Sequence, residues 1–445
     1  MNSYLEIYIT QLSKYFLGCF VVLYALIGVI ILFRNDDEHN NGFLYWMQNI
    51  MMFLFHFSAF LSICFKTGEM DYFVFYIFQQ ILLIAIILLQ KILYPTGDRL
   101  ITNNMCMLMS IGFVILTRLE YNKAVKQFFI IAISVILSMA VPFVIHKFRF
   151  LHTFKWIYAA VGVVAIGAVL LAGQVTYGAN ISYTLGGITF QPSEIVKIIF
   201  VFFVASGFVR ARSIKEVVIT GIIAMLHIFI LVFSKDLGSA LIFGVVYLVM
   251  VFVATGNYFY LFFGLSGATA AAYVALKLFT HIQVRVKAWQ DPWSVIDDAG
   301  YQITQSLFAL SSGSTWGLGL FAGNPQTIPF VEDDFVFSAI VEEMGFVLGI
   351  GLIAICIVSF LRFLIIGARI NSMFYRLLAV GLGTAYIFQV FLTIGGGVKF
   401  IPLTGVTLPF VSYGGSSVLT SILLFECEQG IVLLGQDERL YYEGY

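Results

Sequence analysis

Long uninterrupted apolar runs are the feature that most constrains what this chain can fold into. A helix needs about 20 apolar residues to cross a bilayer, and about thirteen runs here approach that length. Lipid offers the backbone no hydrogen-bond partner, so only helices and closed barrels can cross it, and continuous apolar runs favour helices over a barrel. The predicted spans are residues 15–33, 43–65, 72–94, 100–117, 128–145, 156–175, 195–209, 217–233, 237–254, 258–279, 335–361, 377–393 and 411–434.

The composition agrees with a membrane protein. Hydrophobic residues make up 60% of the 445 residues and charged residues 11%, against roughly a half and a quarter in soluble domains. The first run is long enough to span and has no small-residue cleavage site after it, so we expect it to remain as a transmembrane helix. The sequence therefore predicts an all-α fold, a polytopic bundle of transmembrane helices.

Charge and cysteine usage exclude two other classes of protein. Lys and Arg together number 24, as do Asp and Glu, and there is no basic tail, so we exclude nucleic-acid binding. The five cysteines all fall within apolar runs and form no close-spaced pairs. We interpret them as small core residues rather than metal ligands or redox pairs.

The orientation follows from the short basic loops, which face the cytoplasm in membrane proteins. Alternation then places the long segment 281–334 outside, with segments 176–194 and 395–410, so that three non-helical stretches converge on one face. The N-terminus is outside, and residues 435–445 form a cytoplasmic tail. The basic loop 118–126 falls outside, as an exception to the rule. The residues that set this orientation are Lys147, Arg149, Lys155, Arg210, Arg212, Lys215, Arg362, Arg369 and Arg376.

Three consecutive acidic residues end the long outer segment, immediately before the span that begins at Phe335. These residues, Glu332, Asp333 and Asp334, allow two interpretations. Acidic side chains at a helix N-terminus can cap its free N–H groups and match its dipole. Alternatively, they supply a general base or a divalent-metal ligand at the rim of the bilayer, where desolvation raises the pKa of a carboxyl group.

Further charged residues lie inside the predicted spans, where an isolated charge is costly and should face the bundle interior with a partner. Glu342 and Glu343 either pair with a buried Lys or Arg or line a substrate path. Glu194 and Lys197 are three residues apart, so they share one helix face and can neutralise each other. The same reasoning applies to Lys235 with Asp236 and to Glu426 with Glu428.

Few features of the outer face can bind an anion. If the substrate carries a diphosphate, the cations that bind it must come from a small group of basic residues. The alternative is that these residues are simply solvated. The segment 412–417, Ser-Tyr-Gly-Gly-Ser-Ser, opens the last span, and its small residues serve either close helix packing or a phosphate-facing turn. The outer cations are Lys235, Arg285, Lys287 and Lys399.

Five motifs, in this order, resemble the SEDS family (shape, elongation, division and sporulation) of RodA, FtsW and SpoVE proteins. The resemblance covers about residues 100–434, as a core of about ten helices with a large outer loop, and leaves residues 1–99 as an added unit of about three helices. The motifs are Phe190-Gln191-Pro192-Ser193-Glu194-Ile195-Val196-Lys197; Asp236-Leu237-Gly238-Ser239-Ala240; Asp291-Pro292-Trp293 with Gly300-Tyr301-Gln302; Asp334-Phe335-Val336-Phe337 with Glu342-Glu343-Met344-Gly345; and residues 402–417, from Pro402 to Ser417.

The resemblance implies a peptidoglycan glycosyltransferase of the bacterial plasma membrane. Such an enzyme joins lipid II units with inversion and works with a class B penicillin-binding protein. Asp334 matches the essential aspartate of the outer loop, and Arg285 matches the basic residue before Asp-Pro-Trp. The other expected substrate-binding residues are Lys399, Glu194, Lys197, Asp236, Glu343, Ser416 and Ser417.

The expected reaction has two requirements. A sugar hydroxyl must lose its proton as it attacks the anomeric carbon, for which Asp334 is the expected base. The departing diphosphate gathers negative charge, which Arg285 with Lys399, or a divalent cation such as Mg or Mn near Asp333, can stabilise. Two other functions fit the same residues: a flippase for the lipid-linked precursor, and an inactive scaffold that recruits its transpeptidase.

The sequence also departs from the family pattern. The residues Asn180, Ile181 and Ser182 stand where the family has basic and aromatic contacts. Thr393 replaces a frequent Asn, Lys399 occupies a position that is more often small, and Asp333 places a second carboxylate beside the expected base.

Overall fold

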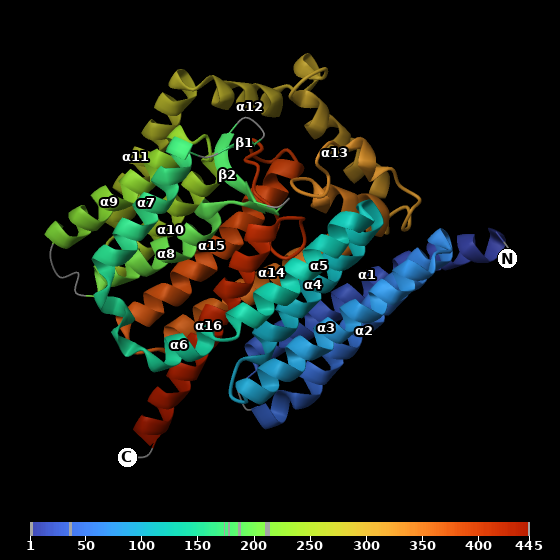
Figure 1. Cartoon of the computed structure of the whole chain (residues 1–445), viewed down its shortest axis with the longest axis horizontal. Coiled ribbons are helices and arrows are strands. Elements are labelled where there is room, and N and C mark those ends of the chain that lie inside the picture. The colour runs from blue at the N-terminus through green and yellow to red at the C-terminus, as the bar shows by residue number, and fades with distance from the viewer. Residues whose placement is uncertain are drawn as a thin grey trace.

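The computed structural model describes residues 3–34, 38–172, 174–176, 179–185, 188–209 and 214–443. Figure 1 shows a helical bundle with a small sheet at one end. The elements are α1 (Ser3–Phe33), α2 (Glu38–Thr67), α3 (Met70–Leu93), α4 (Arg99–Leu119), α5 (Tyr121–Ser138), α6 (Val141–Lys147), η1 (Arg149–Thr153), α7 (Lys155–Ala172), β1 (Gln174–Thr176), β2 (Ala179–Leu185), β3 (Ile188–Phe190), α8 (Pro192–Phe208), α9 (Ile214–Phe233), α10 (Leu237–Thr255), α11 (Tyr258–Leu278), α12 (Thr280–Gln290), η2 (Trp293–Val295), α13 (Gly300–Gly313), η3 (Pro325–Thr327), α14 (Val336–Arg369), α15 (Met373–Gly397) and α16 (Gly415–Glu443).

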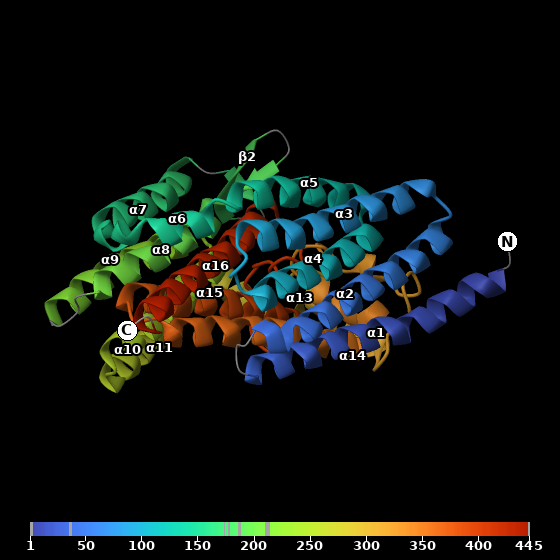
Figure 2. The ribbon, with the colours of Figure 1, turned by 90° about the horizontal axis from the view of Figure 1, so that it is seen from below.

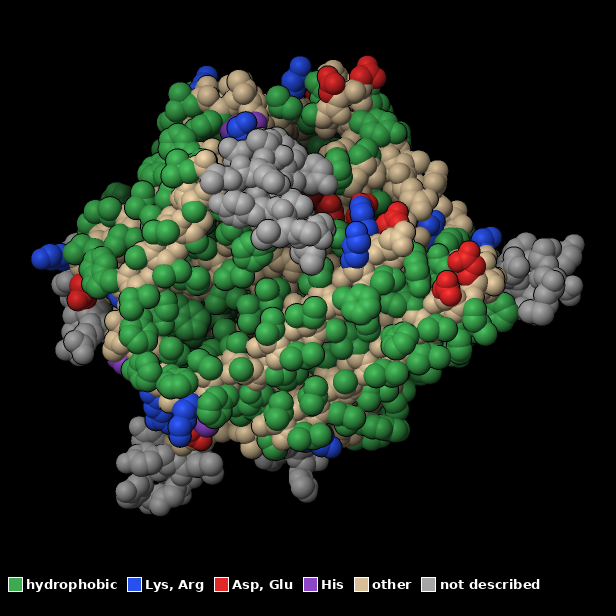
Figure 3. All heavy atoms as spheres, in the orientation of Figure 1, with side chains coloured by type: hydrophobic (Ala, Val, Ile, Leu, Met, Phe, Trp, Pro, Cys, Tyr) green, Lys and Arg blue, Asp and Glu red, His purple; other side chains and the backbone are tan. Residues whose placement is uncertain are grey.

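The predicted transmembrane bundle is confirmed. Eleven helices within the described ranges are long and apolar enough to cross a membrane. They correspond to eleven of the thirteen predicted spans, and the other two predicted spans correspond to the shorter helices α7 and α8. Side chains on the face seen in Figure 3 are mostly hydrophobic, with charged groups gathered toward the ends of the helices. Such a surface suits lipid along the sides and water at both ends.

Helix α4 joins the N-terminal helices to the rest of the bundle. All of its residues from Leu100 to Leu119 are buried, and it packs against α2, α3, α5, α14 and α16. Helices α1 to α3 lie along one flank and α9 to α11 along the other (Figures 1 and 2). Since α1 packs on both α2 and α14, the N-terminal helices form one continuous body with the core.

The three predicted outer stretches do gather at one end of the bundle, which we call the loop face. This end carries the antiparallel strands β1 to β3, helices α12 and α13, and the segment before α16 (Figure 1). The long segment is not free of helix as predicted, because α12 and α13 lie within it. Short polar helices escape a prediction based on apolar length alone. Helix α16 continues through most of the predicted tail, to Glu443, and the cytoplasmic side of that tail stays a prediction.

Helix α14 is interrupted at Gly345, which has φ 87° and ψ 165°, whereas the sequence predicts one continuous span. A broken helix leaves backbone groups without partners, and in a membrane protein these must be satisfied by protein. The segment 314–319 supplies the partners. Leu318 and Gly319 donate their N–H groups to the carbonyls of Glu342 and Glu343, at 2.9 and 2.8 Å.

Helix α1 covers this inserted segment. Lys14 donates through Nζ to the carbonyl of Gly317 at 3.1 Å, and the rings of Tyr15 and Trp316 lie 5.3 Å apart. Gly317 has φ 78°, and a Cβ there would lie 2.3 Å from the carbonyl oxygen of Glu343. Only glycine allows so close an approach. The break in α14, the inserted segment and the added helix α1 are therefore packed as one assembly.

Candidate active site

The acidic residues at the end of the outer segment are fixed by backbone contacts. Tyr413 donates its N–H to the carbonyl of Glu332 at 2.8 Å, and Ser412 donates its hydroxyl to the carbonyl of Asp333 at 2.5 Å. These bonds join the end of the outer segment to the turn that opens α16. The N-cap of α14 is Phe335, which makes no side-chain capping hydrogen bond, so the capping part of the first interpretation is wrong, and the match to the helix dipole stays a prediction.

Asp334 and Arg285 approach each other across Gly405. A Cβ at Gly405, which has φ 75°, would lie 3.9 Å from both Asp334 Oδ2 and Arg285 Nη2. Arg285 is fixed from its other side, since its Nη1 donates to the carbonyls of Thr404 at 3.0 Å and Leu403 at 3.4 Å.

The environment of Asp334 suits a general base. Burial raises the pKa of its carboxyl group to about 6, and the positive charge of Arg285 acts in the opposite direction. Because an efficient base has a pKa not far below the operating pH, this carboxylate is a better proton acceptor than an exposed aspartate. Both residues predicted to act at the reacting centre thus lie together at the loop face.

Asp333 has a different environment. Its Oδ1 is buried and has no hydrogen-bond partner among the described residues. Burial and the neighbouring charges of Glu332 and Asp334 raise the pKa of Asp333 to about 7, and Lys123 lowers it. Lys123 also forms an ion pair with Glu332.

The donor set near Asp333 is small for a metal. No group of three or more His, Cys, Asp or Glu side chains within the described ranges is arranged to hold an ion. Magnesium needs fewer protein ligands, because it is commonly bound by one or two carboxylates and completed by substrate phosphates. The unpartnered oxygen of Asp333 fits that mode, and the metal role of Asp333 stays a prediction.

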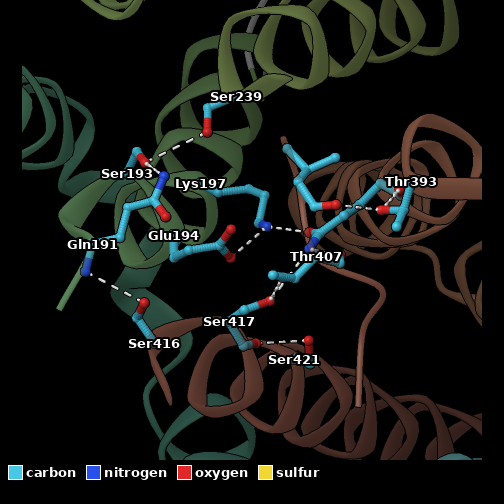
Figure 4. A network of polar contacts seen from close by, with 12 residues as sticks. Gln191, Ser193, Glu194, Lys197, Ser239, Thr393, Thr407, Ser416, Ser417 and Ser421 are labelled. Atoms are coloured by element: carbon cyan, nitrogen blue, oxygen red, sulfur yellow. Dashed lines mark hydrogen bonds and ion pairs between the residues drawn. The ribbon is translucent and has the colours of Figure 1, made fainter. Parts of the chain in front are cut away.

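The predicted pair of Glu194 and Lys197 is confirmed. Lys197 Nζ lies 2.9 Å from Glu194 Oε2 and 2.5 Å from Gln389 Oε1 (Figure 4). Gln389 in turn donates through Nε2 to the carbonyl of Thr407 at 2.9 Å and to Ser417 Oγ at 3.4 Å. This buried network joins α8 and α15 to the turn before α16, and so fixes the segment that contains Gly405.

Asp236 is held by neutral donors. It is the N-cap of α10, where it accepts a bond from the N–H of Ser239 at 3.1 Å. It also accepts from Ser193 Oγ at 2.8 Å and Gln191 Nε2 at 3.1 Å. The predicted buried pair with Lys235 is wrong, because Lys235 is exposed. Lys235 lies in the turn between α9 and α10, at φ 65°.

The remaining predicted substrate residues lie at the same face. Gln191 donates its N–H to Ser416 Oγ at 3.3 Å, and Thr407 donates to Ser417 Oγ at 2.7 Å, as Figure 4 shows. Lys399, at φ 60°, accepts a bond through its carbonyl from Trp289 Nε1 at 3.1 Å. A positive φ explains why small residues suit this position. The substrate contacts of these residues stay predictions.

Arg118 is the cation that pairs with Glu343, and the sequence alone did not identify it. Glu343 is fully buried, and Arg118 donates to it through Nη2 at 2.8 Å and through Nε at 3.0 Å. The prediction that Glu343 pairs with a buried cation is confirmed. The pair also explains the exceptional basic loop 118–126, because Arg118 points into the protein and Lys123 is paired with Glu332. The sequence did contain a signal for this pair, because a basic residue in an outer loop conflicts with the positive-inside rule.

Other polar residues of the site were also missed. They are Gln191, Ser193, Gln389 and Thr407, and each links two or more elements in the network of Figure 4 or around Asp236. Uncharged polar residues are common in helices that pack closely in membranes. Gln191, Ser193 and Thr407 lie within the motifs that carry the family resemblance, which was a signal in the sequence, whereas Gln389 had only its position inside an apolar span.

Comparisons with known proteins agree with this architecture. The model of the FTSW_RODA_SPOVE family, described as a cell cycle protein, matches residues 98–433. The peptidoglycan glycosyltransferase RodA of Mycobacterium tuberculosis is 31% identical over 359 residues, which cover 74% of this chain and 76% of RodA. The probable peptidoglycan glycosyltransferase FtsW of Nitrosomonas europaea is 33% identical over 246 residues, covering 53% of this chain and 63% of FtsW.

A solved structure shares the fold. It was determined in a study of how a peptidoglycan synthase complex coordinates polymerization and crosslinking, and it matches with a TM-score of 0.64 and 24% identity. The match covers 77% of this chain and 98% of that chain. Helices α1 to α3 precede the region that the family model matches. The chain therefore belongs to the FtsW, RodA and SpoVE family of cell cycle proteins, as a multi-pass protein of the bacterial plasma membrane.

Proposed function

We propose that this chain polymerises lipid II into glycan strands, with Asp334 as general base and Arg285 as the cation for the leaving diphosphate. The enzyme class follows from the family, since its curated relatives are named peptidoglycan glycosyltransferases. The observation that carries the proposal is the approach of Asp334 Oδ2 and Arg285 Nη2 across Gly405 at the loop face.

The reaction is a single displacement. The hydroxyl oxygen of one sugar attacks the anomeric carbon of the next while Asp334 accepts the hydroxyl proton. The bond from the anomeric carbon to the diphosphate oxygen breaks, and the diphosphate leaves with the electron pair. Arg285 stabilises the charge that develops there, because a guanidinium binds phosphate oxygens through directed hydrogen bonds. Attack from the side opposite the leaving group gives inversion.

The other predicted residues act around this centre. Lys399 adds a second positive charge for the diphosphate. The buried network of Glu194, Lys197 and Ser417 holds the turn that contains Gly405, and Asp236, Ser416 and Glu343 support the same face. The polyprenyl tail lies along the bundle, since each buried CH₂ contributes about 0.8 kcal/mol.

A divalent cation completes the proposal. Asp333 has a buried oxygen without a hydrogen-bond partner among the described residues and would hold Mg or Mn together with the substrate diphosphate. When bound, the ion would neutralise part of the charge on the leaving group. Arg285 positions that group whether or not the ion is present.

A class B penicillin-binding protein is the proposed partner. The solved relative comes from a study of a complex that coordinates polymerization and crosslinking. Glycan strands need crosslinking after they are polymerised, so a crosslinking partner at the loop face would receive the product where it forms. The flippase alternative is not favoured, because a transporter needs no base beside a cation at the membrane rim.

A polymerisation assay tests the function. Purified chain is incubated with lipid II, with and without a class B penicillin-binding protein, and the length of the glycan product is measured. We expect polymer from the wild-type chain. Movement of lipid II between the leaflets of proteoliposomes, without any polymer under either condition, would instead establish the flippase.

The pH dependence of polymerisation should report the carboxyl group of Asp334. Only its deprotonated form accepts a proton, so the rate should rise through a pH of about 6 and level off above it. The variant Arg285→Gln removes the positive charge that lowers the Asp334 pKa, so its rise should move to higher pH. In Asp333→Asn the rise should persist; its disappearance there would assign the titration to Asp333. Initial rates across the pH range measure both effects.

A further inference from the structure

The segment 314–319, which lies in the break of α14, is held along both of its edges. On one edge its backbone pairs with α14 through four hydrogen bonds of 2.8 to 3.1 Å, two on each side of the break. On the other edge its carbonyls face the added helix α1. Lys14 Nζ donates to the carbonyl of Gly317 at 3.1 Å, and Gln11 Nε2 donates to that of Leu318 at 3.3 Å. The backbone of the segment therefore depends on side chains of α1 as well as on α14.

Close steric contacts also fit α1 to this segment. A Cβ at Gly18 would lie 3.2 Å from Cζ3 of the Trp316 ring. A Cβ at Gly319 would lie 3.0 Å from Cγ2 of Thr10. Interiors packed this closely have few voids and transmit displacements. A shift of α1 would therefore move segment 314–319.

The same segment leads into the stretch that ends in Asp334. Glu342 connects the two parts, because its carbonyl accepts a bond from the N–H of Leu318 at 2.9 Å and its Oε1 accepts one from the N–H of Asn324 at 2.8 Å. The chain from the segment to Asp334 is anchored by three buried apolar side chains, those of Leu320, Ile328 and Val331. A packed stretch of this kind has little slack, so a displacement of the segment is passed on toward Asp334.

We infer that α1 is a positioning element of the active site: through Lys14 and Gly18 it keeps segment 314–319 in the break of α14, and thereby keeps Asp334 in place beside Arg285. The inference rests on the proposed function, in which Asp334 is the base. It gives the added unit a role in the reaction, since α1 precedes residue 98, where the family match begins. The simpler alternative is that α1 only packs against the core and contributes to stability.

The variant Lys14→Met tests the role of the hydrogen bond to Gly317. It removes the donor and keeps a side chain of similar length. We expect kcat for lipid II polymerisation to fall roughly tenfold, since a displacement of about 1 Å at a reacting group can cost about 10²-fold and one lost bond displaces the segment less. KM should not change, and the rate should still rise through a pH of about 6, because the base itself is intact. Lys14→Arg keeps a donor and should restore most of kcat.

Hydrogen exchange of the full chain reports on the segment independently of activity. In Lys14→Met the amides of Leu318 and Gly319 should exchange faster, because opening of the segment breaks their bonds to α14. The net contribution of one hydrogen bond corresponds to a change of up to about tenfold in this opening. The amide of Asn324, which is bonded to Glu342, should follow them if the displacement is passed on.

A second variant and two matched controls complete the design. Gly18→Leu places a side chain against the Trp316 ring, and it should lower kcat and speed exchange in the same way as Lys14→Met. Lys66→Met removes an exposed cation from the last turn of α2. Gly42→Leu adds the same side chain to α2 at a position with nothing within 4 Å. Both controls should keep the wild-type kcat and exchange rates.

The outcomes separate this inference from the proposed function. A wild-type chain that makes no polymer would overturn both. With an active wild type, equal kcat in Lys14→Met and Lys66→Met would overturn the inference alone, and a lower thermal midpoint without a change in kcat per folded molecule would establish the simpler alternative. A lower kcat with unchanged exchange at Leu318 and Gly319 would also overturn it, because α1 would then act by another route.

Discussion

Polymerisation of lipid II should fall by about 10²- to 10⁴-fold in Asp334→Asn, which is the contribution typical of a general base. Asparagine keeps the size of the side chain and its place beside Arg285, but it cannot accept the proton of the attacking hydroxyl. Steady-state rates with purified chain measure the effect. The loss should appear in kcat rather than in KM, since the base acts as the bond forms.

The fold of this variant should be unaffected. Burial raises the pKa of Asp334, which means that the folded protein disfavours the charged form, and a neutral amide removes that cost. A thermal unfolding midpoint equal to that of the wild-type chain checks this. The matched control Asp298→Asn removes an exposed carboxylate from the same outer segment and should keep full activity. Full activity of Asp334→Asn itself would remove Asp334 as the base.

Several features of the fold and the site could be predicted from the sequence. The length of apolar runs identified the bundle, because the cost of an unsatisfied backbone in lipid leaves few alternatives. Spacing identified the pair of Glu194 and Lys197, which are neighbours on one helix face. Asp334 and Arg285 were identified by resemblance, and the structure adds that they meet at Gly405.

Other features depend on contacts that no local pattern encodes. Arg118 and Glu343 are far apart in the sequence, and each alone is only a costly charge in an apolar setting. The break in α14 needs both the φ of Gly345 and the inserted segment 314–319, and neither explains the break without the other. Helices α12 and α13 have only 11 and 14 residues, so a search for apolar runs long enough to span a membrane could not find them.

Breaking the ion pair of Arg118 and Glu343 should have the largest effect on stability. Glu343 is fully buried, and removal of Arg118 leaves an unpaired charge, which typically costs about 3–5 kcal/mol. Arg118→Met should therefore unfold at a clearly lower temperature than the wild-type chain. Arg149→Met is the matched control, because the Arg149 side chain is 66% exposed in its pair with Asp437, and exposed pairs contribute about 0–1 kcal/mol.

The double variant Arg118→Met/Glu343→Met distinguishes an unpaired charge from lost packing. With both charges removed nothing buried remains unpaired, so it should be more stable than Arg118→Met alone. A double variant as unstable as the single one would show that packing against Phe321, whose ring centroid lies 4.3 Å from the guanidinium, is what Arg118 contributes.

The ion pair of Arg118 and Glu343 should also affect catalysis, because it positions the chain that leads to Asp334 and does not itself contact the substrate. Arg118 donates to the carbonyl of Gly323 at 3.5 Å, and Glu342 accepts a bond from the N–H of Asn324 at 2.8 Å. Both contacts hold the chain that continues to Asp334. A displacement of about 1 Å at a reacting group can cost about 10²-fold in rate. We therefore expect Arg118→Met to lower kcat while its rate still rises through a pH of about 6, because the base itself is unchanged.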